Sequence, residues 1–113
     1  MSERDELEQK IYRLRYKQED LEYKIKQVEQ QQEVEEFNLL YSYQRLENEW
    51  EECGESVPEF LDLLEEEREL LDGFRSRKSE LEEQFRYECK KGRDEMDEEL
   101  YGLQKQLRNL EQV

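Results

Sequence analysis

The side chains that could do chemistry in this 113-residue chain are carboxylates and two thiols. The sequence holds 33 Asp and Glu residues, 18 Lys and Arg residues and no histidine. Because histidine is the commonest metal ligand and the commonest general base at neutral pH, its absence removes the usual centre of catalysis. Cys53 and Cys89 lie far apart in the sequence and match no metal-binding or redox spacing. We expect both to be free, partly buried thiols that behave as small hydrophobic residues.

Abundant carboxylates do not by themselves make an active site. They catalyse reactions where a concave, desolvated site shifts their pKa values. The sequence contains no phosphate-binding glycine loop, no nucleophile elbow and no calcium-loop pattern. We therefore predict that the protein is not an enzyme and uses no cofactor or metal ion.

The formal net charge of −15 limits the class of partner. It would repel nucleic-acid phosphate and anionic lipid, so we expect neither nucleic-acid binding nor membrane insertion. No apolar run approaches the roughly 20 residues that span a bilayer. The opening MSERDELEQK lacks the apolar core of a signal peptide, which predicts a cytoplasmic protein, or one co-exported without a cleaved leader.

Apolar residues recur at alternating steps of three and four, which is the spacing of a helical heptad seam. This periodicity predicts long helices and not disorder, although 45% of the residues are charged. The predicted seam positions of the first half are Leu7, Ile11, Leu14, Leu21, Ile25, Val28, Leu39, Tyr43, Leu46 and Trp50. Those of the second half are Phe60, Leu64, Leu71, Phe74, Leu81, Phe85, Cys89, Met96, Leu100, Leu103, Leu107 and Leu110.

The stretch ENEWEECGESVPEF, residues 47–60, contains the residues that would interrupt a helix. Gly54 is predicted to stop the first helix as a left-handed cap. Ser56 and Glu59 form a capping-box pattern, and Pro58 suits the first turn of a helix because its missing N–H costs nothing there. We predict helix one over about residues 2–52, a turn over about 53–57 and helix two over about 58–112.

The two predicted seams can face each other, because facing positions of an antiparallel hairpin have residue numbers with a nearly constant sum. Leu46 with Leu64 and Ile25 with Phe85 both add up to 110. The other predicted pairs at this sum are Trp50 with Phe60, Leu39 with Leu71, Leu21 with Cys89, Leu14 with Met96, Leu7 with Leu103, Gln18 with Gly92 and Gln32 with Lys78.

The predicted fold is therefore all-α: a single long antiparallel two-helix hairpin, or helix-turn-helix coiled coil. A continuous rod that dimerises is the alternative, but it would carry Pro58 in mid-helix at a cost of about 3 kcal/mol or more. In the hairpin, Trp50 closes the seam at the bend, or it contacts a partner directly.

Apolar residues that lie off the seam predict a surface for a partner, since aromatic residues on a charged helix are common interface anchors. Leu107 and Leu110 lie at or beyond the end of the pairing, as a frayed end or as a grip on another protein. The tyrosines of the half that lies away from the turn cover the seam or contact a partner. The predicted partner surface consists of Phe37, Leu40, Tyr41, Leu63 and Leu70, with Leu107 and Leu110 at the C-terminal end.

Charge is concentrated near the turn. Residues 47–69 contain eleven carboxylates and a single basic residue, Arg68. Such a run is either a solvated face or a surface for a basic partner.

A helical hairpin with Trp50 and Gly54 at the bend resembles the WXG superfamily of type VII secretion systems in Gram-positive bacteria. The family turn is Trp-any-Gly, whereas EEC separates the two residues here, and no export signal of an aromatic residue with an acid four residues later follows Gly92. The segments ELEQKIYRLRYKQEDLEYKI and QEVEEFNLLYS are similar to the small acidic helical-hairpin proteins encoded beside LXG toxins.

This resemblance implies a targeting factor or chaperone and not a secreted substrate. Together with a second small helical protein, it would bind the helical N-terminal LXG domain of a cognate toxin for type VII secretion. The alternative is a self-associating structural coiled coil, either a spacer or a homodimeric four-helix bundle. An adaptor should be monomeric or weakly associated alone and should gain thermal stability only with its partner. A structural coiled coil should instead be a stable, fully helical homodimer alone at micromolar concentration.

Overall fold

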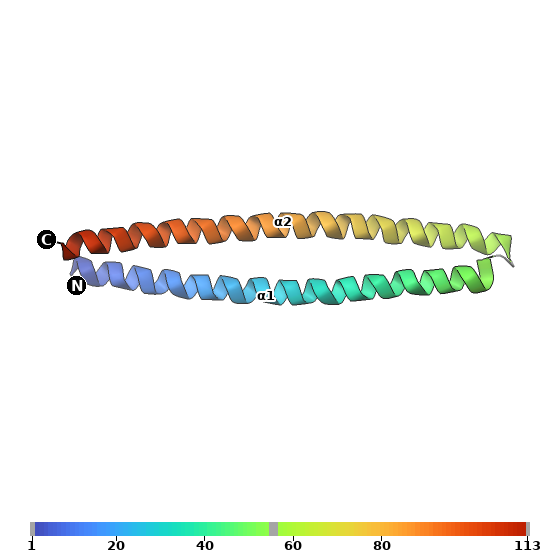
Figure 1. Ribbon diagram of the computed structural model, residues 1–113, viewed down its shortest axis with the longest axis horizontal. Coiled ribbons are helices and arrows are strands. Elements are labelled where there is room, and N and C mark those ends of the chain that lie inside the picture. The colour runs from blue at the N-terminus through green and yellow to red at the C-terminus, as the bar shows by residue number, and fades with distance from the viewer. Residues whose placement is uncertain (1, 55–56, 113) are drawn as a thin grey trace. The chain divides into compact units, whose positions relative to one another are not determined.

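The computed structural model describes residues 2–54 and 57–112 of the chain. Its elements are the α-helix α1 (Glu3–Glu49), the π-helical turn η1 (Trp50–Gly54) and the α-helix α2 (Pro58–Glu111). Figure 1 shows α1 and α2 running in opposite directions, and the described residues contain no strand. The prediction of an all-α, two-helix hairpin is confirmed.

The first helix begins with a cap that the sequence analysis missed. The backbone N–H of Asp5 donates to Ser2 Oγ at 3.2 Å, and the N–H of Glu6 donates to the Ser2 carbonyl at 3.1 Å. The bond to Ser2 Oγ satisfies an amide that a helix start leaves without a partner, and the bond to the Ser2 carbonyl is the first regular bond of the helix. The signal was present in the sequence, since a serine with an acid three residues later is a capping pattern.

At the other end, α1 stops at Glu49, earlier than predicted, and the chain continues through η1. The end of α1 is followed directly by this wide π-helical turn, which includes the position of Gly54. Pro58 is the first residue of α2, and the N–H of Phe60 donates to the Val57 carbonyl at 2.9 Å. Ser56, the predicted cap of α2, lies outside the described residues.

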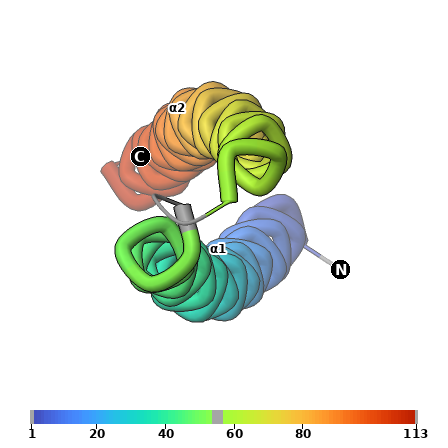
Figure 2. Tube along the Cα trace, turned by 90° about the vertical axis from the view of Figure 1, so that its right-hand side faces the viewer, coloured from blue at the N-terminus to red at the C-terminus, as the bar shows by residue number. Residues whose placement is uncertain are grey.

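The chain divides into two compact units. Unit 1 combines Met1–Val28 with Phe85–Val113, and unit 2 is Glu29–Gln84. Each unit therefore holds one segment of α1 and one segment of α2, and the end-on trace in Figure 2 shows the two helices of unit 2 side by side at the turn.

Unit 1 has the seam that the sequence predicts. The buried residues are Leu7, Ile11, Leu14, Ile25 and Cys89, all from predicted seam positions. Gly92 also lies in this seam, where an added Cβ would be 3.7 Å from the Leu21 side chain. At the end of the unit, Arg4 Nη2 lies 3.5 Å from Glu111 Oε1. Near this end of the helix pair Leu107 is half-buried and Leu110 is exposed, so Leu107 contributes to the end of the seam and Leu110 does not.

Unit 2 has a more polar seam than predicted. Leu39, Leu46 and Leu64 are buried, but the fourth buried residue is Lys78. Leu61, and not Phe60, occupies the seam position next to the turn, because Leu61 is half-buried and Phe60 is exposed. The predicted pairing of Trp50 with Phe60 is therefore wrong. Phe74 and Leu81, which were also predicted in the seam, are exposed.

Candidate partner-binding faces

A charged cluster fills the middle of the unit 2 seam. Lys78 is only 8% exposed, and its Nζ forms ion pairs with Glu36 Oε2 at 3.0 Å and, more closely, with Glu82. The hydrogen bond to Glu82 and then the one to Glu36 raise the pKa of Lys78 above its usual 10.5, so the amine stays charged. Glu36 and Glu82 are half-buried, and their carboxylates retain access to water.

A second polar contact lies closer to the turn. Tyr43 Oη donates to Asp72 Oδ1 at 2.6 Å, and Arg75 Cζ lies 5.6 Å from the centre of the Tyr43 ring. Burial, followed by the hydrogen bond to Asp72, raises the pKa of the Tyr43 hydroxyl. These contacts join α1 to α2.

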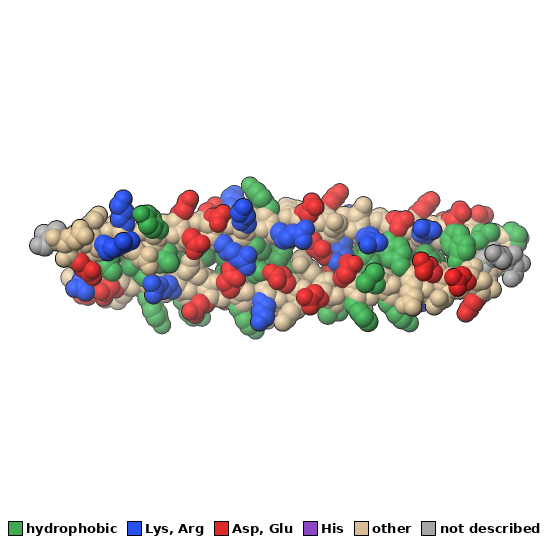
Figure 3. Space-filling model, in the orientation of Figure 1, with side chains coloured by type: hydrophobic (Ala, Val, Ile, Leu, Met, Phe, Trp, Pro, Cys, Tyr) green, Lys and Arg blue, Asp and Glu red, His purple; other side chains and the backbone are tan. Residues whose placement is uncertain are grey.

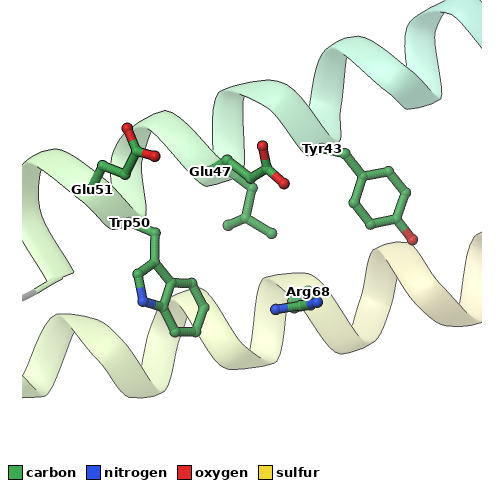
Figure 4. Close-up of a pocket in the computed structure, with 6 residues that line it drawn as sticks. Tyr43, Glu47, Trp50, Glu51 and Arg68 are labelled. Carbon is green, nitrogen blue, oxygen red and sulfur yellow. The ribbon is translucent and has the colours of Figure 1, made fainter.

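Trp50 borders an open groove beside the turn. Figure 4 shows its indole, the Tyr43 ring and the Arg68 side chain in the space between α1 and α2. The groove has a volume of about 390 Å³ and is lined by Tyr43, Leu46, Glu47, Trp50, Glu51 and Arg68. Trp50 is half-buried, so it contributes to the seam while one side of the indole stays accessible from the groove.

The outer surface of α1 in unit 2 carries an apolar patch, the α1 face, formed by Val34, Phe37, Leu40 and Tyr41. All four are exposed, and Phe37 has the largest exposed fraction at 72%. Figure 3 shows hydrophobic side chains projecting from α1 in this part of the molecule. Three of the residues predicted to bind a partner, Phe37, Leu40 and Tyr41, therefore lie together on one accessible surface.

Helix α2 carries a second apolar stripe, the α2 face, formed by Phe60, Leu63, Leu70, Phe74 and Leu81. All are exposed, Leu70 by 76%. Their positions follow steps of three and four when Glu67 and Arg77 are included. The stripe is thus a second heptad repeat. Phe60, Leu63 and Leu70 each come one residue before the seam positions Leu61, Leu64 and Leu71.

The polar contacts of unit 1 show which sides of an antiparallel helix pair correspond. Glu22 follows the seam residue Leu21, and Arg93 follows the seam residue Gly92. Arg93 Nε and Nη2 bond the two Glu22 carboxylate oxygens at 2.6 and 2.9 Å. This bidentate pair lowers the pKa of Glu22. Residues that follow seam positions on the two helices therefore share one side of the seam, as in antiparallel coiled coils.

The same geometry places the two apolar faces of unit 2 on opposite sides of its seam. Leu40 follows the buried Leu39, whereas Leu70 precedes the half-buried Leu71. The sequence analysis took the apolar residues beside the seam for one stripe, but they form two separate surfaces. Their members Phe60, Phe74 and Leu81 were missed because the two repeats on α2 differ by a single residue.

The exposed apolar groups of unit 1 are of another kind. They are Tyr12, Tyr16, Tyr23, Tyr87 and Tyr101, together with Leu110, and each of the tyrosines is 62–75% exposed. A tyrosine keeps its hydroxyl in water while its ring is accessible. The Tyr23 hydroxyl, for example, accepts a hydrogen bond from Gln27 Nε2 at 2.9 Å.

The described residues include no cluster of three or more Cys, Asp or Glu side chains that could hold a metal ion. None of the helices, as far as residues 2–54 and 57–112 show, has a stretch apolar and long enough to cross a membrane. No protein-family model, curated protein or solved structure matches the chain.

Proposed function

We propose that this chain is a non-catalytic targeting factor or chaperone that acts in the cytoplasm or is co-exported. With a second small helical protein, it binds the helical N-terminal LXG domain of a cognate toxin for type VII secretion. The class of partner is suggested by the resemblance of the sequence to the small hairpin proteins encoded beside LXG toxins. The α1 face suggests how it binds.

The observation that carries the proposal is the exposed α1 face. Phe37, Leu40 and Tyr41 are 54–72% exposed and belong to no seam. A helix that packed its own apolar stripe on these residues would bury them by ordinary helix packing. Aromatic side chains such as Phe37 and Tyr41 supply much of the energy of such interfaces.

Co-expression with the products of neighbouring reading frames, followed by size-exclusion chromatography with light scattering, tests the proposal. We expect the wild-type chain to co-elute with an LXG-domain protein and with a second small helical protein. Phe37→Glu should abolish co-elution, because it places a charge in the desolvated centre of the interface. Circular dichroism should show nearly unchanged helicity, since Phe37 contacts solvent in the free chain.

Tyr12→Glu is the matched control, because Tyr12 is an equally exposed aromatic residue on the same helix but in unit 1. This variant should co-elute like the wild type. The proposal fails if no neighbouring product co-elutes with the wild-type chain, or if Phe37→Glu binds as well as Tyr12→Glu does.

A further inference from the structure

The α2 face has the pattern of an interface, although all five of its apolar side chains are exposed in the described chain. Five of its seven heptad positions are Phe or Leu, and the other two are Glu67 and Arg77. Neither Glu67 nor Arg77 forms an ion pair among the described residues. A partner of this stripe should have apolar side chains opposite the five Phe and Leu residues. It should also have charges of opposite sign facing Glu67 and Arg77.

The stripe is complementary to itself. When two copies of α2 lie antiparallel with facing residue numbers that add up to 144, Leu63 faces Leu81, Leu70 faces Phe74 and Glu67 faces Arg77. The two-fold symmetry of such a pair repeats each contact. All apolar positions from Leu63 to Leu81 then meet apolar positions, and the two charges neutralise each other.

Other registers lose this match. A shift of one heptad in one direction places Glu67 against Leu70, and a shift in the other direction places Arg77 against Phe74. A parallel pair would place each charge against its own copy, and like charges at facing positions are destabilising. The antiparallel register at 144 is therefore the one that the side chains specify.

Gly73 lies at the centre of this arrangement. It is a mid-helix glycine, and an added Cβ would meet nothing within 4 Å in the chain. Glycine in a helix costs roughly 1 kcal/mol relative to alanine, so the fold of the chain alone gives no reason for it. Beside the two-fold axis, which passes close to residue 72 in this register, the missing side chain would let two helices approach closely.

We propose that the α2 face binds a second copy of this chain, with the two α2 helices antiparallel and Glu67 of each copy paired with Arg77 of the other. The α1 face lies on the opposite side of the seam and stays free in this homodimer. Because the α1 face stays free, a dimer of the chain alone no longer distinguishes a structural coiled coil from an adaptor, and only the co-elution test does so. The dimer does not depend on the proposed function.

Sedimentation equilibrium of the full chain and a charge-exchange series test the proposal. The wild type should be a dimer at micromolar concentration. Glu67→Arg and Arg77→Glu should each raise the dimer Kd about tenfold or more, since each replaces two ion pairs by two like-charge pairs. The double variant Glu67→Arg/Arg77→Glu restores both pairs and should return the Kd to within about threefold of the wild type.

Phe37→Glu is the control, because it changes the opposite side of unit 2 and should leave the dimer intact. All variants concern exposed residues, and unchanged circular dichroism would confirm that they fold. A wild-type chain that stays monomeric at 100-fold higher concentration overturns the proposal, as does a dimer that either single variant leaves unchanged or that the double variant does not restore. Either result leaves the co-elution test of the α1 face standing.

Discussion

The two units of this chain are built from the same two helices but distribute their apolar residues differently. Unit 1 buries five hydrophobic residues in its seam and exposes mainly tyrosines. Unit 2 buries three leucines and a lysine in its seam and exposes leucine and phenylalanine on two opposite faces. Unit 1 therefore buries aliphatic residues in its own seam, whereas unit 2 leaves leucine and phenylalanine side chains exposed.

The difference is also one of side-chain chemistry. A tyrosine at the surface can hydrogen-bond water, so the exposed tyrosines of unit 1 need no partner. Leu70 and Phe37 have no polar group, and they are more than 70% exposed. Contiguous exposed groups of this kind mark interaction sites. Both proposed interfaces therefore lie on unit 2.

The largest predicted loss of stability distinguishes substitutions in the seam of unit 2 from substitutions on its exposed faces. Leu64 is 2% exposed, and Leu64→Ala should lower the free energy of unfolding by about 2–5 kcal/mol because it leaves a cavity. Phe37→Ala, although it removes a larger side chain, should change it by less than about 0.5 kcal/mol. Urea denaturation followed by circular dichroism measures both. Similar losses in the two variants would mean that the α1 face is part of the core.

A smaller effect concerns the polar seam. Lys78→Met should leave unit 2 as stable as the wild type or about 1 kcal/mol more stable, because methionine fills the same space without desolvating a charge. The half-buried Glu36 and Glu82 can turn towards water. Lys78→Ala should instead lower the free energy of unfolding by about 1–3 kcal/mol, since it leaves a gap. If Met destabilises as much as Ala, the ion pairs themselves hold the seam together.

The sequence was sufficient to predict unit 1. Its seam residues, such as Leu14 and Ile25, are apolar on one helical line, and no competing apolar line lies beside them. The fold class and the position of Pro58 at the start of a helix also follow from local signals.

Unit 2 could be predicted only in part, because α2 carries two heptad repeats offset by one residue. Residue type favoured Leu81 for the seam, whereas the structure buries Lys78, which forms ion pairs with carboxylates from both helices. The predicted pairing of Gln32 with Lys78 had already placed Lys78 at a seam position. That Glu36 and Glu82 would supply the compensating charges depends on packing that a single sequence does not specify.

The comparison between the units is tested most directly by hydrogen–deuterium exchange of the wild-type chain, alone and in the complex obtained by co-expression. Binding should slow amide exchange in unit 2, above all at residues 34–41, because a packed partner helix suppresses local opening. Unit 1 should change little. Added protection confined to the tyrosine-bearing segments of unit 1, with none at residues 34–41, would contradict the placement of the proposed interfaces on unit 2.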